Sequence, residues 1–295
     1  MPSAAITATS PLGHGVLAEA LLPAVLEAGA VEMRHYRAGV AVDTKADQSP
    51  VTLADQEAEA ILIAAIRKAA PGIPIVAEEA VAGGDLPDIG RRFFLVDPLD
   101  GTREFINKRD EFTVNIALVE DGVPRFGIVF VPALGDLYVT LGPNRSAHAR
   151  IAEGHAIDTL AVDTLAAAGL QDIRVRTPDP GALTAVASRS HLTPETEDYL
   201  AQYRIAARRD AGSSLKFCLI ARGEADIYPR LGPTMAWDTA AGHAVLLAAG
   251  GLVTDMAGVA LTYATRPDLG AKDRLRNPHF VAWGAPKPFA ALGKP

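Results

Sequence analysis

Residues 93–102, Phe-Phe-Leu-Val-Asp-Pro-Leu-Asp-Gly-Thr, constrain the fold more than any other stretch of this chain. The four apolar residues at the start are typical of a short buried strand, because a helix would need a longer run. We expect the strand to end at Asp97, since Pro98 cannot donate a ladder hydrogen bond and Gly101 permits conformations that other residues resist. Asp97 and Asp100 would then point from the tip of the strand toward one place.

Two interpretations of this acidic turn stay open. Carboxylates, a backbone carbonyl and water are the oxygen ligands that Mg²⁺ prefers, so the turn is a candidate metal site. Alternatively, Asp97 and Asp100 only form an Asp-Pro turn with a capping aspartate. A metal cluster needs ligands from several elements, so the rest of the chain decides between the two.

The composition excludes several classes of function. The chain has 295 residues, 49% of them hydrophobic, which is enough for one large or two moderate domains. A net charge of −7 offers no overall basic surface for a nucleic-acid polymer. The single cysteine, Cys218, excludes an internal disulfide and a Cys-rich zinc site.

The sequence carries no signal for export or membrane insertion. No Lys or Arg precedes Arg34, so the basic start of a secretory signal is absent. No uncharged apolar stretch reaches the length of about 18 residues that would cross a bilayer. We expect a cytoplasmic protein, and peripheral contact with the inner membrane stays open.

The first half of the chain is predicted to pack two helices on an antiparallel sheet. Apolar spacing predicts an amphipathic helix over residues 17–36, and a capping box of Thr52 and Asp55 predicts another over residues 53–70. Short or alternating apolar runs bounded by turns predict strands at 40–47, 73–77, 93–97, 112–118, 126–131 and 137–140.

The second half alternates strands and helices, which predicts a mixed or mainly parallel sheet. Residues 142–181 show no sustained period apart from a short strand at 173–176. We therefore predict an α+β domain over 1–150 that carries most metal ligands, and an α/β domain over 151–295 that supplies Asp238 and the substrate side. The expected elements are strands at 184–188, 205–206, 226–228, 252–256 and 280–283, and helices after 193, over 215–223 and over 239–249.

Two further acidic stretches share the placement of the first. Glu78 and Glu79 follow a predicted strand, and Asp238 stands directly before a predicted helix. Each has a simpler explanation, since Asp238 suits an N-cap and the glutamates suit a solvated loop. Together, however, these carboxylates come from three separate elements, as a metal cluster requires.

The three motifs together resemble those of one family. The run 97–102, with Glu78-Glu79 before it and residues 237–242 (Trp-Asp-Thr-Ala-Ala-Gly) after it, resembles the inositol monophosphatase-like phosphatases. Within them the chain is most similar to the bacterial 3′(2′),5′-bisphosphate nucleotidases, through residues 45–52, 111–117, 212–218 and 228–230. The resemblance implies a layered α-β-α-β-α sandwich of the inositol monophosphatase and sugar phosphatase type.

The resemblance also implies hydrolysis of a phosphate monoester with two or three Mg²⁺ ions. Glu78, Asp97 and the carbonyl of Leu99 would hold one ion. Asp97, Asp100 and Asp238 would hold the second.

The same resemblance assigns the catalytic groups. Thr102, assisted by Asp55 or Glu78, would orient the attacking water, and the amides of Gly101 and Thr102 would receive the phosphate. Asp55 has a competing role in its own capping box, although one carboxylate can serve both purposes.

The resemblance also implies that the segment with Ser213 and Ser214 lines the substrate site, with Lys216 and Arg230 as candidates for binding a second phosphate. Both could instead be surface charges, and Ser213 and Ser214 could only cap the helix that follows. The predicted substrate-binding residues are Glu78, Leu99, Asp100, Gly101, Thr102, Ser213, Ser214, Lys216, Arg230 and Asp238.

The implied activity is removal of the 3′-phosphate of adenosine 3′,5′-bisphosphate, with a role in sulfur assimilation and sensitivity to Li⁺. The expected partner is a small phosphonucleotide, and the protein would be a monomer or homodimer. One alternative is an inositol or sugar phosphate monoesterase with the same metal centre. Another is a haloacid dehalogenase phosphatase, although there one residue, not Pro98 and Leu99, separates the aspartates. A third is a non-catalytic phosphonucleotide-binding regulatory module.

Overall fold

The computed structural model of the protein describes residues 13–39, 42–44, 50–151, 169–188, 193–263, 269 and 273–291. Residues 45–49, which contributed to the family resemblance, lie outside the described residues.

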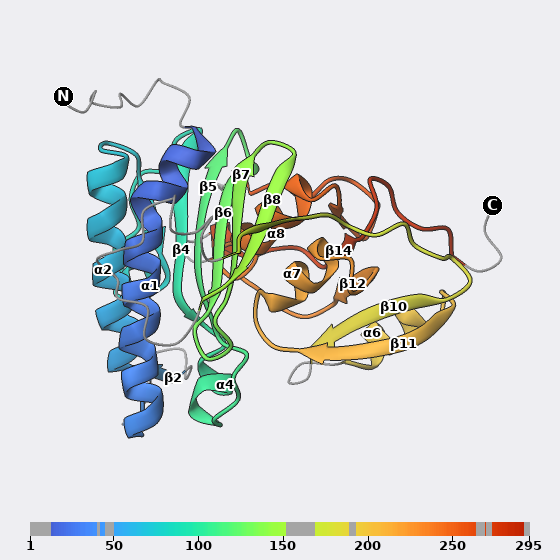
Figure 1. Ribbon diagram of the computed structural model, residues 1–295, viewed down its shortest axis with the longest axis horizontal. Coiled ribbons are helices and arrows are strands. Elements are labelled where there is room, and N and C mark those ends of the chain that lie inside the picture. The colour runs from blue at the N-terminus through green and yellow to red at the C-terminus, as the bar shows by residue number, and fades with distance from the viewer. Residues whose placement is uncertain are drawn as a thin grey trace.

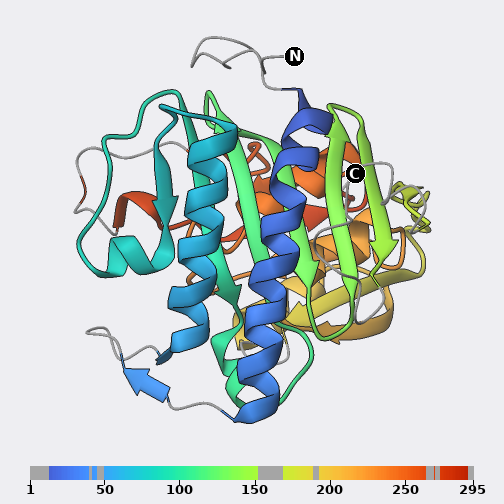
Figure 2. The same ribbon diagram turned by 60° about the vertical axis from the view of Figure 1, so that its left-hand side comes forward.

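Sheets and helices alternate in layers through the described part of the chain (Figure 1). Helices α1 and α2 lie side by side on the outer face of a seven-stranded sheet (Figure 2). Helices α7 and α8 fill the space between this sheet and a five-stranded one, and α6 packs near the outer face of the second sheet. The predicted layered α-β-α-β-α sandwich is confirmed. None of the described helices is both long and apolar enough to span a bilayer.

The helices are α1 (His14–Ala38), α2 (Leu53–Ala69), α3 (Glu78–Ala82), α4 (Thr102–Ile106), α6 (Pro194–Leu200), α7 (Leu215–Ala221), α8 (Ala240–Ala248) and the 3₁₀ turn η2 (Asp273–Leu275). The large sheet runs in the order β3 (Ile75–Ala77), β4 (Arg92–Asp100), β5 (Thr113–Glu120), β6 (Val123–Val131), β7 (Asp136–Gly142), β8 (Arg145–Arg150) and β9 (Gln171–Ile173). The second sheet runs in the order β11 (Ile205–Ala211), β10 (Leu183–Ser188), β12 (Ile227–Arg230), β14 (Phe280–Trp283) and β13 (Leu252–Asp255). A two-stranded ribbon pairs β1 (Val42–Thr44) with β2 (Pro50–Thr52).

Strand β4 shows why its sequence is apolar without alternation. Phe94 and Val96 belong to the core under α1 and α2, whereas Phe93 and Leu95 belong to the core shared with α7 and α8. Successive side chains of a strand point to opposite faces, and here both faces are covered. A continuous apolar run is the consequence.

The prediction that this strand ends at Asp97 is wrong. Strand β4 continues to Asp100, and its register shifts, because Asp97 lies opposite Asn115 while Asp100 lies opposite Thr113. Three steps along β4 match two along β5, so β4 carries one extra residue as a bulge. Pro98 lies in this bulge, where its missing N–H removes no ladder bond.

The predicted second sheet is mixed, with β10 parallel to β11 and β12, and β14 antiparallel to β12 and β13. The interpretation of residues 142–181 needs correction, because it contains β8, and β9 begins earlier than the strand expected at 173–176. The buried residues of β8 are Ser146, Ala147 and Ala149, which are too small or polar to produce an apolar signal. Strand β9 lies after residue 150 in the sequence but belongs to the first sheet. The predicted domain boundary between residues 150 and 151 therefore stays a prediction.

Helix α8 approaches the large sheet closely at Gly127 in β6. A Cβ atom at Gly127 would lie 2.4 Å from the carbonyl oxygen of Ala241 and 2.9 Å from the Cβ of Ala244. The absence of a side chain at Gly127 therefore sets how near α8, and with it the residues just before α8, can lie to the sheet.

Gly127→Ala is expected to destabilise the protein by roughly 1–3 kcal/mol, because the backbone of α8 must move away from the sheet. Gly15→Ala is the matched control, since a Cβ at Gly15 in α1 meets nothing within 4 Å and alanine favours a helix. Denaturant unfolding of both variants measures the difference. Equal stability of the two would contradict close packing at Gly127.

Candidate metal centre

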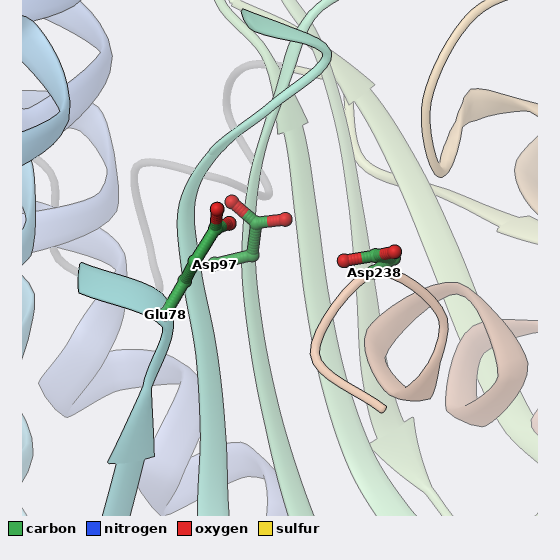
Figure 3. A group of neighbouring side chains, drawn as sticks. All are labelled: Glu78, Asp97 and Asp238. Carbon is green, nitrogen blue, oxygen red and sulfur yellow. The ribbon is translucent and has the colours of Figure 1, made fainter. Parts of the chain in front are cut away.

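Three carboxylates meet at one edge of the large sheet. Ala77 in β3 pairs with Val96 in the parallel strand β4, so Glu78, just after β3, and Asp97, the next residue of β4, lie side by side. Asp238 reaches the same place from the loop before α8 (Figure 3). Each side chain offers one oxygen, and these oxygens lie within 4.8 Å of one another.

This spacing fits a divalent cation. Ligand oxygens on opposite sides of Mg²⁺ lie about 4.2 Å apart, from two bonds of about 2.1 Å each, so a small contraction of the cluster suffices. Asp97 is buried, and Glu78 and Asp238 are half-buried. Anionic groups removed from water in this way need compensation from positive charge, which a cation supplies.

Electrostatics point the same way. The pKa of Asp100 is raised to about 6, mainly by burial, with Lys216 lowering it and Glu104 raising it. The pKa of Asp238 is raised well above its ordinary value by burial, and then by the charges of Asp100 and Glu78. Crowding of like charges makes the ionised form costly without a bound cation.

The segment that carries Glu78 is held by a residue that the sequence analysis missed. Glu59 in α2 accepts hydrogen bonds from the backbone amides of Glu79, at 2.8 Å, and Ala80, at 2.9 Å. These amides belong to the first turn of α3, which otherwise lacks a side-chain cap. A glutamate on a helix face gives no sequence signal for a contact with a distant turn.

Asp238 is not the N-cap of α8, so that simpler alternative is wrong. Thr239 occupies the N-cap position, and Asp238 Oδ2 accepts a hydrogen bond from the Met235 amide at 2.8 Å. Asn277, also missed in the sequence, holds this loop by donating to the Met235 carbonyl at 2.7 Å and to Thr239 Oγ1 at 3.0 Å.

The capping box at the start of α2 is confirmed. The Thr52 amide donates to Asp55 Oδ2 at 2.7 Å, and Thr52 Oγ1 accepts from the Ala54 amide. Thr102 Oγ1 donates to the Leu99 carbonyl at 3.3 Å. Asp55 is buried, and it is not among the described residues that line the cavity over the carboxylates.

That cavity brings most of the predicted site residues together. Ser214 and Asp55 are the predicted site residues that lie outside its described lining. The residues that line it are Glu78, Asp97, Leu99, Asp100, Gly101, Thr102, Ser213, Lys216, Arg230 and Asp238, together with Glu104, Tyr228 and others.

Ser213 and Ser214 do not cap α7 with their side chains. Ser214 holds the N-cap position without a side-chain capping bond, and Ser213 Oγ donates to the Asp100 carbonyl at 2.8 Å. Ser213 thereby lies against Gly101, whose φ of 92° and lack of a Cβ allow the approach.

Lys216 and Arg230 are buried, so the alternative that they are surface charges is wrong. Lys216 Nζ donates to the Ser213 carbonyl at 2.6 Å and lies over the Tyr228 ring, and burial lowers its pKa to about 8 against the opposing effect of Asp100. Arg230 donates from Nη2 to the Pro233 carbonyl at 3.1 Å. Its buried Nε has no hydrogen-bond partner among the described residues.

The family model of the inositol monophosphatase family matches residues 16–281, which is most of the chain. The chain belongs to this family. Among curated relatives, the 3′(2′),5′-bisphosphate nucleotidase CysQ of Shigella flexneri is 44% identical over 226 residues, which are 76% of this chain and 84% of the relative. CysQ of Escherichia coli O157:H7 is 42% identical over 242 residues, 81% of this chain and 90% of the relative.

Solved structures agree with this assignment. CysQ from Bacteroides thetaiotaomicron, a bacterial member of the inositol monophosphatase family, matches with a TM-score of 0.73 and 35% identity, over 92% of this chain and 97% of that one. The Thermotoga maritima IMPase shares the fold, with a TM-score of 0.65 at 23% identity over 89% of this chain and 90% of that one.

The raised pKa of Asp100 predicts a pH-dependent effect of Asp100→Asn on the metal-free protein. The folded state favours the protonated acid, so this contribution to stability is present below about pH 4 and is lost as the pH rises through about 6. In EDTA at pH 8, Asp100→Asn should therefore melt about 5 °C above the wild type, with little difference at pH 4. Mg²⁺ should raise the melting temperature of the wild type more than that of the variant.

Asp172→Asn is the control, since Asp172 is an exposed partner of Arg145 on β9, at the opposite edge of the large sheet from β3. It should leave both the pH dependence and the Mg²⁺ response unchanged. If Asp100→Asn is no more stable than the wild type in EDTA at pH 8, the ionised Asp100 carboxylate does not destabilise the metal-free fold, and the inferred repulsion is wrong.

Proposed function

We propose that the protein is a Mg²⁺-dependent 3′(2′),5′-bisphosphate nucleotidase that converts adenosine 3′,5′-bisphosphate to AMP and phosphate. The observation that carries the proposal is that one cavity joins the carboxylate cluster to two buried cations, Lys216 and Arg230. The names of the curated relatives support the same substrate class.

The cation pair favours a substrate with two phosphates. A buried donor without a partner is unusual in a native protein, and Arg230, which lines the cavity, has such a donor in its Nε. A guanidinium binds phosphate oxygens in a fixed geometry, and Lys216 adds a second charge beside it. We assign these two residues to the phosphate that is not cleaved.

The carboxylates form the metal-binding part of the proposed site. Glu78, Asp97 and the Leu99 carbonyl would hold one ion, and Asp97, Asp100 and Asp238 a second. Bound Mg²⁺ would neutralise the scissile phosphate and make water easier to deprotonate. Glu78, Asp97 and Asp238 already lie together, and Asp100 adds charge beside them.

The remaining groups act on the water and the phosphate. Thr102 would orient the attacking water, assisted by Glu78 or Asp55, with its hydroxyl already directed by the Leu99 carbonyl. The amides of Gly101 and Thr102 follow each other at a left-handed residue and a helix start, an arrangement that suits an anion. Ser213 completes this wall of the cavity.

A panel of phosphate monoesters assayed with Mg²⁺, with and without Li⁺, tests the proposal. We expect the highest kcat/KM for adenosine 3′,5′-bisphosphate and inhibition by Li⁺. A clear preference for inositol 1-phosphate would instead establish an inositol phosphatase with the same centre. Binding of the bisphosphate without turnover would establish a regulatory module, and an aspartyl-phosphate at Asp97 would establish a dehalogenase-type mechanism.

Arg230→Gln tests the site for the second phosphate. Loss of a charged hydrogen bond should lower kcat/KM for adenosine 3′,5′-bisphosphate at least tenfold, while turnover of adenosine 3′-monophosphate changes little. Arg209→Gln is the control, because Arg209 is half exposed and pairs with Glu224. Equal losses on both substrates would remove Arg230 from recognition of the second phosphate.

Thr102→Ala tests the orientation of water. We expect kcat to fall roughly 100-fold or more, with the Mg²⁺-induced rise in melting temperature retained. Thr102→Ser keeps the hydroxyl and should recover most of the activity. A Thr102→Ala variant with full kcat would show that this hydroxyl has no part in the reaction.

A further inference from the structure

Ser214 lies under the wall of the cavity rather than in it. It is fully buried at the start of α7, and the cavity lining includes its neighbour Ser213 but not Ser214. Its hydroxyl is covered by protein, so any effect on the reaction must pass through the groups that it contacts.

Those groups are two of the predicted metal ligands. The Ser214 amide donates to Asp100 Oδ2 at 2.7 Å, and Ser214 Oγ donates to the backbone carbonyl of Asp238, also at 2.7 Å. Asp100 ends a strand of the first sheet, whereas Asp238 precedes a helix in the second half of the chain. One small residue thus joins two ligand segments that are far apart in sequence.

Backbone amides bind one carboxylate oxygen of each of these two aspartates. Asp100 Oδ2 takes the Ser214 amide, and Asp238 Oδ2 takes the Met235 amide. In the part of the chain that the structure describes, no hydrogen bond reaches Oδ1 of either residue. Each carboxylate is therefore oriented through one oxygen, and both residues line the cavity, which is how a preorganised ligand is held.

Ser146 shows what the same bond does away from the cavity. It is also fully buried, and its Oγ donates to the Val245 carbonyl of α8 at 2.8 Å. Ser146 and Ser214 thus make the same kind of bond to the same region of the chain. Only the bond of Ser214 holds a segment that carries a predicted metal ligand.

We propose that Ser214 is a positioning residue of the metal centre, whose hydroxyl holds Asp238 at the correct distance from Asp100. The role rests on the proposed metal centre. Removal of the hydroxyl leaves the Asp238 carbonyl without its donor and lets the loop before α8 shift. Outer-shell changes of this kind typically weaken metal binding 10- to 100-fold.

The test compares Mg²⁺ binding by Ser214→Ala and Ser146→Ala with that of the wild type, by isothermal titration calorimetry on the full chain. We expect Ser214→Ala to weaken binding at least tenfold, and to require correspondingly more Mg²⁺ for half-maximal activity. Ser146→Ala should lose similar thermal stability in EDTA but bind Mg²⁺ like the wild type. If Ser214→Ala does not fold, Ser214→Cys replaces it, because a thiol fills the space but donates weakly.

A folded Ser214→Ala or Ser214→Cys variant that binds Mg²⁺ within twofold of the wild type would overturn the proposal and leave the proposed function intact. Equal weakening by Ser146→Ala would also overturn it, since the loss would then reflect general stability. A wild-type protein that binds no Mg²⁺ would contradict the metal centre itself, and this role with it.

Discussion

Mutual repulsion among four carboxylates is the constraint on which the architecture around the cavity depends. Each of the three aspartates accepts a backbone amide, from Leu99 to Asp97, from Ser214 to Asp100 and from Met235 to Asp238. These bonds offset only part of the desolvation, because the pKa values of Asp100 and Asp238 stay raised. The uncompensated negative charge favours a bound cation. The same repulsion therefore destabilises the metal-free fold and provides the capacity to bind a metal ion.

The layered fold is what brings these charges together. Both faces of β4 are covered, so its polar end is the part that can reach an open cavity. The bulge between Asp97 and Asp100 lets one strand deliver two carboxylates and a carbonyl without breaking the sheet. Close approach of α8 at Gly127 then fixes where Asp238 can lie. The candidate metal site lies between layers and would tolerate little displacement, which fits the hydrogen bonds that hold the loops around it.

The same cavity also holds two buried basic side chains, Lys216 and Arg230, beside the carboxylates. Burial of Lys216 is made tolerable by Asp100, whose charge opposes the fall in the lysine pKa. The buried Nε of Arg230 has no hydrogen-bond partner among the described residues. Acidic and basic groups therefore share one cavity, and under the proposed function they would bind metal and a second phosphate, respectively. Under that proposal, the two basic side chains are the physical basis for preferring a bisphosphate over a simple monoester.

The sequence by itself determined the local features: the strands with apolar runs, the capping box of Thr52 and Asp55, and three acidic motifs whose combination indicates a family and its layered fold. Local patterns do not predict β8, because its buried residues are small. They also place the end of β4 too early, because the bulge that accommodates Pro98 depends on pairing with the neighbouring strand. Only the tertiary structure decided which carboxylates meet, that Asp238 is no cap, and that Ser214 lies behind the cavity. Distances between segments far apart in the chain are set by packing and backbone hydrogen bonds, which no local pattern encodes.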